Sequence, residues 1–411
     1  MLILFYIILL ALPLNLGKHF IFDFSYSEGA LIDYALPTVY VQDLLILLFL
    51  VLHVVLCRTL PKKSIYLLPL ILLLLLNILT SANIFASVYF ASRLVIYSFF
   101  ALISTKYLKK ISGKALILLL VISISSISLL ALTQWVLQHS LFNNYIFFGE
   151  QPYFFLTPGI LHHTFLGDSV IPPYAIFKHP NVLGGYLSIA LVSLVLLLIS
   201  YTKVISTGLS LFLFISVLLG TLIVFLTFSY SAWLSFFLGI CFVYLSNYNR
   251  RIAMVIMPLV VTFVFILGMF GFFSASLGIS SNSLSRRLVL IQSSAHLFTS
   301  SPYFGTGLNT NAFLIKDTPF FVREVNFFQP VHNIYWLLLS EGGLVLFIPF
   351  IILVLYSYLK SLKINIFVSV TLSQFLLLGV FDHYLLTSHQ MLLLVLLTLA
   401  ASLNYTFKHE I

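Results

Sequence analysis

The chain has 411 residues, of which 61% are hydrophobic and only 8% are charged, and its net charge is +9. An average soluble domain is about half apolar and a quarter charged, so this composition excludes a soluble globular protein. The basic residues gather in short connections between apolar runs, which argues against nucleic acid as the partner of the positive charge.

Continuous apolar runs of about 20 residues are long enough to cross a bilayer as helices, and backbone groups in lipid must be paired within each helix. A closed barrel would instead show short alternating strands. The sequence therefore predicts an all-α protein, a polytopic transmembrane helical bundle that forms one integral membrane domain over residues 1–411. We expect about 12 spans, near residues 2–16, 43–57, 65–80, 86–105, 115–137, 184–201, 207–228, 231–246, 252–273, 341–359, 364–380 and 388–404.

The distribution of charge predicts the topology. The first apolar run has no basic residue at its start, so we expect a retained helix and no cleaved signal peptide. With a cytoplasmic N-terminus, 13 of the 20 Lys and Arg residues face inward, whereas Glu410 alone of the 11 acids does. This positive-inside pattern predicts that both termini are cytoplasmic, and we assign the inner basic residues no ligand. They are Arg58, Lys62, Lys63, Lys106, Lys109, Lys110, Lys114, Lys203, Arg250, Arg251, Lys360, Lys363 and Lys408.

The same topology leaves three substantial segments on the outer face, at residues 17–42, 138–183 and 274–340. The cytoplasmic connections are too short for a soluble catalytic domain, so any chemistry is expected outside or within the membrane. The segment 274–340 is the longest and carries the predicted active site. We find no internal repeat, which weakly disfavours a secondary transporter.

Residue types that commonly bind metals are sparse and poorly spaced. Cys57 and Cys241 lie in separate apolar runs and form neither a disulfide framework nor a metal motif. His162, His163 and Asp168 have suitable side chains, but loop histidine pairs are seldom ligands. An Asp-x-Asp pair is absent, which argues against a metal-bound nucleotide-sugar donor. We therefore expect no metal and no cofactor.

Two helices are predicted around the long outer segment. Apolar residues recur at helical spacing from Leu284 to Phe298, which predicts a helix along the membrane surface that starts at a serine cap and ends before Pro302. Gly305 and Gly307 allow a tight turn after it. A second helix is expected to begin near Val331 and to continue into the tenth span, with His332 in its first turn.

Arg287 and His332 are the strongest catalytic candidates. A guanidinium binds phosphate through two parallel charge-assisted bonds, so Arg287 and, less strongly, Arg286 are candidates for a phosphate-bearing substrate. The alternative is that these side chains only extend along the membrane interface. His332 is the candidate general base, because a neutral imidazole accepts a proton at physiological pH. The alternative is a histidine that merely anchors a helix end.

Two further charges lie in or beside apolar runs. Arg93 falls inside the fourth predicted span, where a charge costs at least about 2.5 kcal/mol and usually faces a cavity or a partner. It is therefore a candidate substrate ligand, with a structural pair to an acid such as Asp43 as the alternative. Glu341 is a candidate for orienting a neighbouring arginine, or else a hydrated acid at a helix end.

Polar residues also stand at two other predicted helix ends on the outer face. Lys178 is a candidate for phosphate binding and His179 for a hydrogen bond to a sugar, although Pro180 also marks an ordinary helix start. Asp382 and His383 close the eleventh span, where a paired acid and imidazole can shape a substrate site.

The order of these motifs resembles the O-antigen ligase and O-antigen polymerase superfamily of bacterial membrane proteins. Arg286-Arg287, the following amphipathic helix and Gly305-Thr306-Gly307 resemble the long outer loop of that family. His332-Asn333 followed by Glu341-Gly342-Gly343 is similar to its His-Asn motif. The segments from Phe177 to Asn181 and from Phe381 to Tyr384 are also similar.

The resemblance implies a multi-pass glycosyltransferase of the C-type fold in the bacterial inner membrane, with an extracytoplasmic active site. It implies a glycan donor on an undecaprenyl or other polyprenyl diphosphate, and a sugar hydroxyl on a glycan or lipid-linked acceptor. The product would be a surface polysaccharide of the cell envelope, such as the O-antigen of lipopolysaccharide, made by polymerisation or ligation. Transfer would be inverting and metal-independent, with Arg287 at the diphosphate and His332 at the acceptor.

Two positions depart from the family pattern. An arginine expected at the start of a middle span is replaced in Ser229-Tyr230-Ser231, so Arg93 or Lys178 is a candidate for the missing charge. Leu346 stands where the family commonly has a small residue. The rival hypothesis is a transporter or flippase of lipid-linked glycans, which shares the spans and the basic site. The sequence does not distinguish a ligase from a polymerase and does not identify the sugar.

Overall fold

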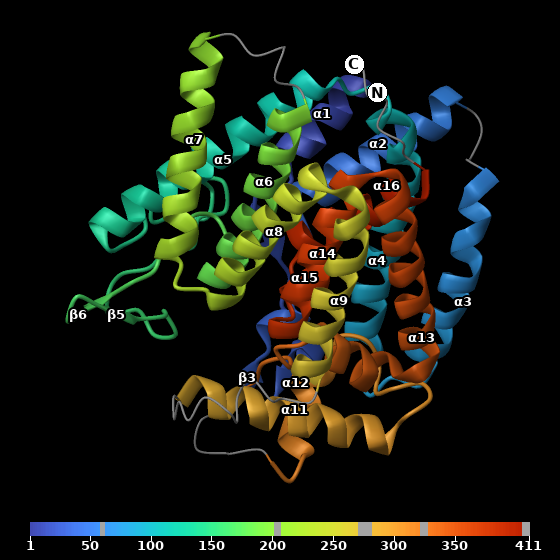
Figure 1. The fold of residues 1–411 in the computed structure, drawn as a ribbon. Helices are drawn as coiled ribbons and strands as arrows, with labels where there is room; N and C mark the ends of the chain where they lie inside the picture. Colours follow the sequence, from blue (N-terminus) through green and yellow to red (C-terminus); the bar gives the residue numbers. More distant parts are fainter. Residues whose placement is uncertain (58–61, 201–206, 270–281, 321–327, 405–411) are drawn as a thin grey trace.

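The computed structural model of the chain describes residues 1–411 except 58–61, 201–206, 270–281, 321–327 and 405–411. The described residues form a helical bundle (Figure 1). Six helices in them are long and apolar enough to cross a membrane, namely α4 (Ile84–Leu108), α5 (Gly113–Leu137), α6 (Pro180–Ser200), α8 (Tyr230–Tyr248), α9 (Arg250–Met269) and α13 (Ile334–Ile364). Apolar stretches of 10–17 residues lie in α1 (Leu2–Ala11), α2 (Val41–Cys57), α3 (Leu67–Leu79), α7 (Thr207–Leu226), α14 (Ile366–Phe381) and α16 (His389–Asn404).

These helices stand where the apolar runs predicted them, which confirms an all-α polytopic membrane protein. The number of crossings stays a prediction, because only six of the described helices are long enough to cross a membrane. One boundary differs clearly from the prediction. The first helix ends at Ala11, ahead of Pro13, whose ring cannot donate the next backbone bond. The tenth span continues a helix that begins at Ile334, near the start predicted around Val331, and this helix contains a kink at Gly343. Arg58, Lys203 and Lys408, and the loop residues 274–281 and 321–327, lie outside the described residues.

Several helices start at polar caps that the sequence places directly before the apolar runs. The side-chain oxygen of Asn83 accepts from Ala86 N at 3.1 Å, and Ser112 accepts from Ala115 N at 3.2 Å. Asn365 caps α14 in the same way through Val368 N at 3.3 Å. Such caps satisfy amide groups that a helix cannot pair within itself, and each stabilises a helix by about 0.5–2 kcal/mol.

Polar contacts inside the bundle hold the central helices α6, α8 and α14 together. Gln374 of α14 donates from Nε2 to the carbonyl of Ser188 on α6 at 3.2 Å and to Oγ of Ser235 on α8 at 3.3 Å. Gly185 of α6 allows the ring of Tyr384 to pack directly on its backbone, because a Cβ there would lie 2.1 Å from the phenol oxygen. Small residues and interhelical hydrogen bonds replace the hydrophobic driving force that is missing between helices in lipid.

The outer segments are compact. Helix α11 (Asn282–Ser300) crosses one end of the bundle, opposite the end at which α1 lies (Figure 1). It ends at Ser300, as the sequence predicted. The remaining short elements are β1 (Gly17–His19) paired with β4 (Thr38–Tyr40), β2 (Tyr26–Ser27) paired with β3 (Ala30–Leu31), β5 (His163–Phe165) paired with β6 (Asp168–Val170), α12 (Asn311–Leu314), α15 (Tyr384–Thr387), and the 3-10 turns Asp23–Ser25, Asp33–Ala35, Lys62–Tyr66 and Ile315–Asp317.

Candidate functional site

His332 lies in the connection immediately before α13, one residue ahead of the helix cap. Asn333 is the cap, and its Oδ1 accepts from Tyr335 N at 2.9 Å and from Trp336 N at 3.1 Å. The prediction that His332 lies in the first turn is therefore wrong by two residues, since the cap and not the histidine satisfies the free amides. The imidazole is not needed to cap the helix. It keeps 18% of its side-chain surface exposed, so a reactant can approach it.

Asp382, at the end of α14, brings three distant parts of the chain together. Its Oδ1 lies 3.3 Å from His332 Nδ1 and accepts from His383 N at 2.8 Å. Its Oδ2 accepts from Asn181 Nδ2, at the start of α6, at 3.0 Å. A carboxylate only accepts, so Nδ1 of His332 carries the proton of that contact and Nε2 faces away. The carboxylate, 5% exposed, thus fixes the tautomer and the orientation of the ring.

The second nitrogen of His332 faces Gln329, which the sequence did not single out. Nε2 lies 3.3 Å from Gln329 Oε1. With an oxygen there, both ring nitrogens donate and the ring is an imidazolium. Rotation of the amide by 180° presents its NH2 group and leaves a neutral ring with an accepting Nε2. The side-chain amide of Gln329 therefore occupies the space next to Nε2 of His332.

The buried groups around this pair are electrostatically coupled to it. Burial lowers the pKa of His179 to about 4 and that of His383 to about 3, with Asp382 acting against burial. Burial alone would raise the pKa of Asp382, but the charge and the hydrogen bond of His332 hold it well below its usual range. His179 and His383 are thus neutral at physiological pH, while Asp382 is ionised.

Both neutral histidines are held by their own neighbours. Nδ1 of His179 accepts from Asn181 N at 3.1 Å, and Nδ1 of His383 lies 2.7 Å from Thr387 Oγ1. Tyr34, from the first outer segment, packs its ring edge-on against His383 at 5.3 Å between ring centroids. His383 in turn lies 5.0 Å from the ring of His332. Sequence analysis did not identify Tyr34, because its contact with His383 forms only in the folded protein.

Arg287, on α11, lies near the same cluster. Its positive charge contributes to lowering the pKa of Asp382, His179 and His383, so it stands within electrostatic range of all three. Its side chain is partly buried, and among the described residues it has no hydrogen-bond or ion-pair partner. Arg286, one residue earlier, is exposed. Arg287 and His332 therefore both act on the charge of Asp382, and their joint role in a substrate site stays a prediction.

Lys178 is exposed directly before His179, and its charge also acts on His19. Burial is the main cause that lowers the pKa of His19, at the end of β1, and the charge of Lys178 is the second. Within the described residues the ammonium has no ion-pair partner. It is therefore available to an anion near His179.

Arg93 is in a different setting. Its guanidinium lies 3.2 Å from Asp43 Oδ2 and also donates to the carbonyl of Thr38. The rings of Tyr40 and Tyr89 lie over it, with centroids 5.2 Å and 4.8 Å from Cζ. These partners correspond to the structural alternative weighed for this residue. A substrate contact at Arg93 stays a prediction.

Glu341 is buried in α13 and binds backbone, not a described arginine. Its Oε2 accepts from Asn309 N at 2.9 Å and its Oε1 from Asn311 N at 2.8 Å. The backbone oxygen of Glu341 accepts from Gly307 N at 2.9 Å and from Asn77 Nδ2 at 2.8 Å. Gly305 is required in this contact because its φ is +69° and a Cβ would lie 2.3 Å from that oxygen. The Glu-Gly-Gly motif thus fastens the Gly305–Asn311 loop onto α13.

Asn311 is a further residue that the sequence reasoning missed. It is fully buried, and its Nδ2 donates to Ser294 Oγ on α11 and to Ser340 Oγ on α13, each at 3.0 Å. Its Oδ1 accepts from Val331 N, adjacent to His332, at 3.1 Å. One side chain therefore joins the helix of Arg287 to the connection that carries His332. The only sequence signal was an asparagine four residues after the second turn glycine.

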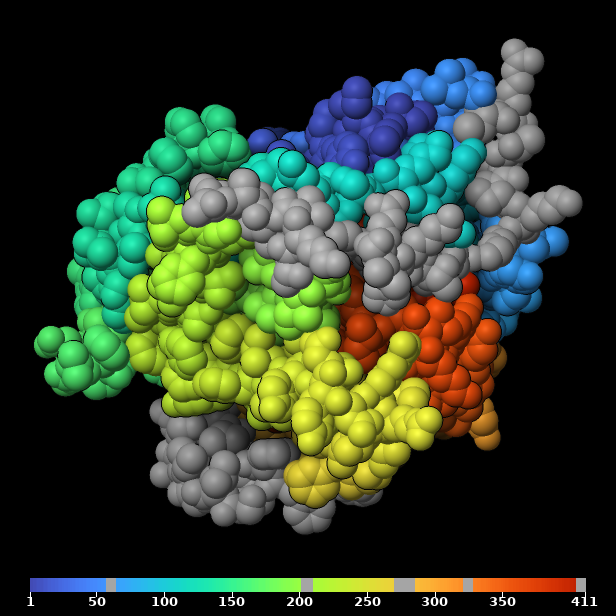
Figure 2. All heavy atoms as spheres, turned by 45° about the horizontal axis from the view of Figure 1, so that its top comes forward, coloured from blue at the N-terminus to red at the C-terminus, as the bar shows by residue number. Residues whose placement is uncertain are grey.

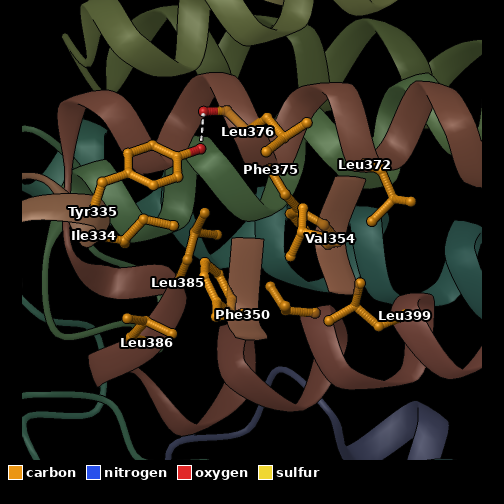
Figure 3. Close-up of a pocket in the computed structure, with 11 residues that line it drawn as sticks. Ile334, Tyr335, Phe350, Val354, Leu372, Phe375, Leu376, Leu385, Leu386 and Leu399 are labelled. Atoms are coloured by element: carbon orange, nitrogen blue, oxygen red, sulfur yellow. Dashed lines mark hydrogen bonds between the residues drawn. The ribbon is translucent and has the colours of Figure 1, made fainter. Parts of the chain in front are cut away.

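A small pocket lies behind the site, between α13, α14 and α16 (Figure 3). Its volume is about 30 Å³, and its lining is apolar, with Tyr335 turned to the carbonyl of Leu376 at 3.0 Å. It holds no more than a water-sized group and includes neither Arg287 nor His332. This pocket is a packing gap below the site, and a shared substrate cleft for the two residues stays a prediction.

The cluster also has the residue types of a metal site. One ligand atom each from His332, Asp382 and His383 lies within 4.8 Å of the others. However, His332 Nδ1 and Asp382 Oδ1 already bond each other, and His383 Nδ1 bonds Thr387. The hydrogen-bond network accounts for the arrangement. The predicted pair His162 and His163 with Asp168 does not belong to this cluster.

Residues 215–351 match the family model described as O-antigen ligase. This match covers about a third of the chain and supports the resemblance to the O-antigen ligase and polymerase superfamily. No curated protein matches the chain. The matched region contains Arg287, His332 and Glu341. Lys178, His179, Asp382 and His383 lie outside it and reach the site only through the fold.

The structure also shows the position of Tyr230, where the sequence departs from the family pattern. Tyr230 is the first residue of α8 and is exposed, with its ring edge-on to Trp233 at 5.3 Å. It supplies no charge to the site. Leu346, the second departure, is buried with Leu338 and Leu308 in an apolar cluster. It fills space between α13 and the glycine loop, so this change affects packing and not the polar site.

Proposed function

We propose that this protein transfers a glycan from a polyprenyl diphosphate carrier to a sugar hydroxyl at the outer face of the membrane. The observation that supports it best is the convergence of His332, Asp382 and Arg287 from three separate parts of the chain, with no partner for Arg287 among the described residues. A base, a residue that orients it and a free cation are what displacement of a diphosphate by a hydroxyl needs.

In the proposed step, Nε2 of neutral His332 takes the proton of the acceptor hydroxyl as its oxygen attacks the anomeric carbon. The bond between that carbon and the diphosphate oxygen breaks, and the diphosphate leaves with the electron pair. A single displacement of this kind inverts the anomeric centre. Asp382 stabilises the positive charge that the ring gains, through the contact at Nδ1.

Arg287 is proposed to bind the departing diphosphate. Fixed positive charge stabilises the negative charge that develops on the leaving group, and a guanidinium matches phosphate oxygens in pairs. A diphosphate carries more charge than one guanidinium neutralises. Lys178, exposed and without a described partner, is the better candidate for the second cation than Arg93, whose charge is met by Asp43.

Replacement of His332 by Ala tests the proposal directly. Membranes that contain the variant and lipid-linked glycan should show transfer lowered by a factor of about 10²–10⁴, the usual contribution of a general base. His296→Ala is the matched control, because His296 is exposed on α11 in the same outer region. Unchanged transfer by intact His332→Ala protein would contradict the proposal and favour a transporter or flippase, which needs no base.

Two measurements refine the proposal. We expect excess chelator to leave transfer unchanged, since His332 is assigned to a proton and not to a metal; a loss restored by Zn²⁺ would reassign the cluster. Mass analysis of the lipid-linked glycans that accumulate without the protein separates the two family activities. Single repeat units indicate a polymerase, whereas long chains indicate a ligase.

A further inference from the structure

The second outer segment has an unusually apolar exposed surface. In the aromatic loop, defined here as residues 141–166, Leu156 and Leu166 are each 90% exposed and Ile146 is 73% exposed. Six phenylalanines and a tyrosine of the same loop are also exposed. A soluble surface rarely presents so many large apolar side chains together, so this surface requires an apolar partner.

The exposure does not come from a lack of internal structure. The buried carboxylate of Glu150 accepts from Leu141 N at 2.7 Å and from Phe142 N at 2.6 Å. Ser140 N donates to the carbonyl of Tyr153, and Tyr153 N donates to Ser140 Oγ, each at 3.1 Å. The loop is therefore a built scaffold that holds its aromatic side chains outward.

The loop is also continuous with the lipid-facing surface of the bundle. The loop follows α5 directly. Val136, near the end of that candidate span, is 72% exposed. Phe165 of the β5–β6 hairpin packs on Trp135 of α5, with ring centroids 5.6 Å apart. The hairpin lies beside the ends of α5 and α7 at the edge of the molecule, and the green protrusion at the left of Figure 2 shows this edge.

The absence of basic residues from the loop indicates which kind of apolar partner it contacts. The chain has no Lys or Arg between Lys114 and Lys178. The surface therefore has nothing to attract an acidic protein or an anionic lipid headgroup. Asp168, directly beyond the loop, is exposed near Leu166 at the tip of the hairpin. An apolar surface with an acid at its tip fits the headgroup boundary of a bilayer, where aromatic residues are enriched.

We propose that the aromatic loop is inserted in the interface of the outer leaflet and forms part of the membrane-embedded surface of the protein. Irregular backbone is excluded from the hydrocarbon centre because its polar groups need partners. The loop therefore lies at the boundary, with Leu156 and Leu166 toward the acyl chains and Asp168 toward water. The inference concerns membrane contact alone and does not depend on the proposed glycosyl transfer.

The test is spin-label accessibility in vesicles of phosphatidylcholine. The label is placed by Leu156→Cys or Leu166→Cys, each in a chain with Cys57→Ser and Cys241→Ser. Val136→Cys is the lipid-exposed reference, and Asp317→Cys, on an exposed outer turn, is the aqueous reference. We expect both loop labels to resemble position 136, with a several-fold higher ratio of collisions with oxygen to collisions with a soluble nickel complex than position 317.

Two results would overturn the proposal. Loop labels as accessible to nickel as position 317 would place the loop in water. Broadening of the spectrum that disappears on dilution with unlabelled protein would place a second copy of the chain on this surface. All labelled positions are surface side chains, and a single elution peak in detergent together with unchanged helix content by circular dichroism verifies that each variant is folded.

Discussion

Arg93 and Arg287 are two of the arginines that the sequence predicted as ligands, and their surroundings in the fold differ. Arg93 lies inside a span, with an acid at 3.2 Å and two aromatic rings over it. Arg287 lies on an outer helix, partly buried, without a partner among the described residues, beside Asp382 and His332. A charge with a complete set of partners, such as that of Arg93, stabilises the folded structure. A charge without a described partner, such as that of Arg287 near His332, is available to a ligand.

The largest effect that tests this contrast is expected at Asp382. Asp382→Asn keeps the shape but lets the side chain donate toward His332, which disturbs the tautomer that the base needs. We expect transfer to fall by about 10²–10⁴ with little change in the amount of folded protein. Asn181→Ala, which removes one bond to the same carboxylate, should have a smaller effect. Equal transfer by Asp382→Asn and the wild type would separate His332 from catalysis.

Arg287→Gln should lower transfer by about 10²–10³, the effect of removing one group that stabilises a developing negative charge. Thermal stability should stay unchanged, because the guanidinium has no described partner to lose. Arg251→Gln, at the start of α9, is the control for loss of charge alone. Loss of folding instead of activity in Arg287→Gln would make this arginine structural, like Arg93.

The Arg93–Asp43 pair should show the opposite behaviour. Either Arg93→Met or Asp43→Asn leaves one charge without its partner and is expected to cost about 3–5 kcal/mol of stability. The double variant should cost less than the two single changes together, since no unpaired charge remains. Thermal unfolding in detergent measures all four proteins. A fully stable Arg93→Met variant that has lost transfer would instead support a ligand role for Arg93.

Asn311→Ala should weaken the connection between the two helices of the site. It leaves Ser294, Ser340 and Val331 N without their partner, at about 1–3 kcal/mol for each buried group left unpaired. We expect a lower unfolding temperature, and reduced transfer in the protein that stays folded, because α11 and His332 lose their common anchor. Asn247→Ala, at an exposed helical position of α8, is the control for loss of an asparagine side chain. Normal stability of Asn311→Ala would contradict this reading.

The smallest expected effect is on the pH dependence of stability. The pKa of His179 is lowered to about 4 by burial, so the unfolded chain binds a proton there at a higher pH than the folded protein does. Stability from this group is complete above the ordinary value of about 6.5 and is lost as the pH falls from there toward 4. His179→Gln should flatten this part of the curve of unfolding temperature against pH. An unchanged acid limb in the variant would assign the loss to other groups.

Much of the fold was accessible from the sequence because lipid imposes a simple rule. Apolar length predicts a helix, and the polar residues Asn83, Ser112 and Asn365 mark where helices begin. The ends were less accurate, as in α13, which starts at Ile334 because Asn333 caps it well before the apolar run that marked the span. Six helices reach the length of a crossing, so the number of spans depends on tilt and packing that no sequence window contains.

The candidate site was predictable in its parts but not in its connections. Residue chemistry pointed to His332, Arg287, Asp382 and His179, because polar groups at the ends of apolar runs are costly without a role. The same reasoning did not identify Gln329, Asn311 or Tyr34. These residue types are common elsewhere in the chain, and these three gain a role only through contacts with His332, Val331 and His383 in the folded protein. It offered Glu341 either as a residue that orients an arginine or as a hydrated acid at a helix end, whereas the buried carboxylate accepts from the backbone of the glycine loop.

The sequence by itself determined that the protein lies in a membrane, which of its loops carry the charge, and which residues are chemically able to act. The length of an apolar run and the asymmetry of charge are local properties, so each can be recognised from a short stretch of sequence. Only the tertiary structure decided that Asp43 takes up Arg93 while Asp382 orients His332. Pairing between charges depends on distances across the fold, and residues 50 positions apart in the chain meet in both cases.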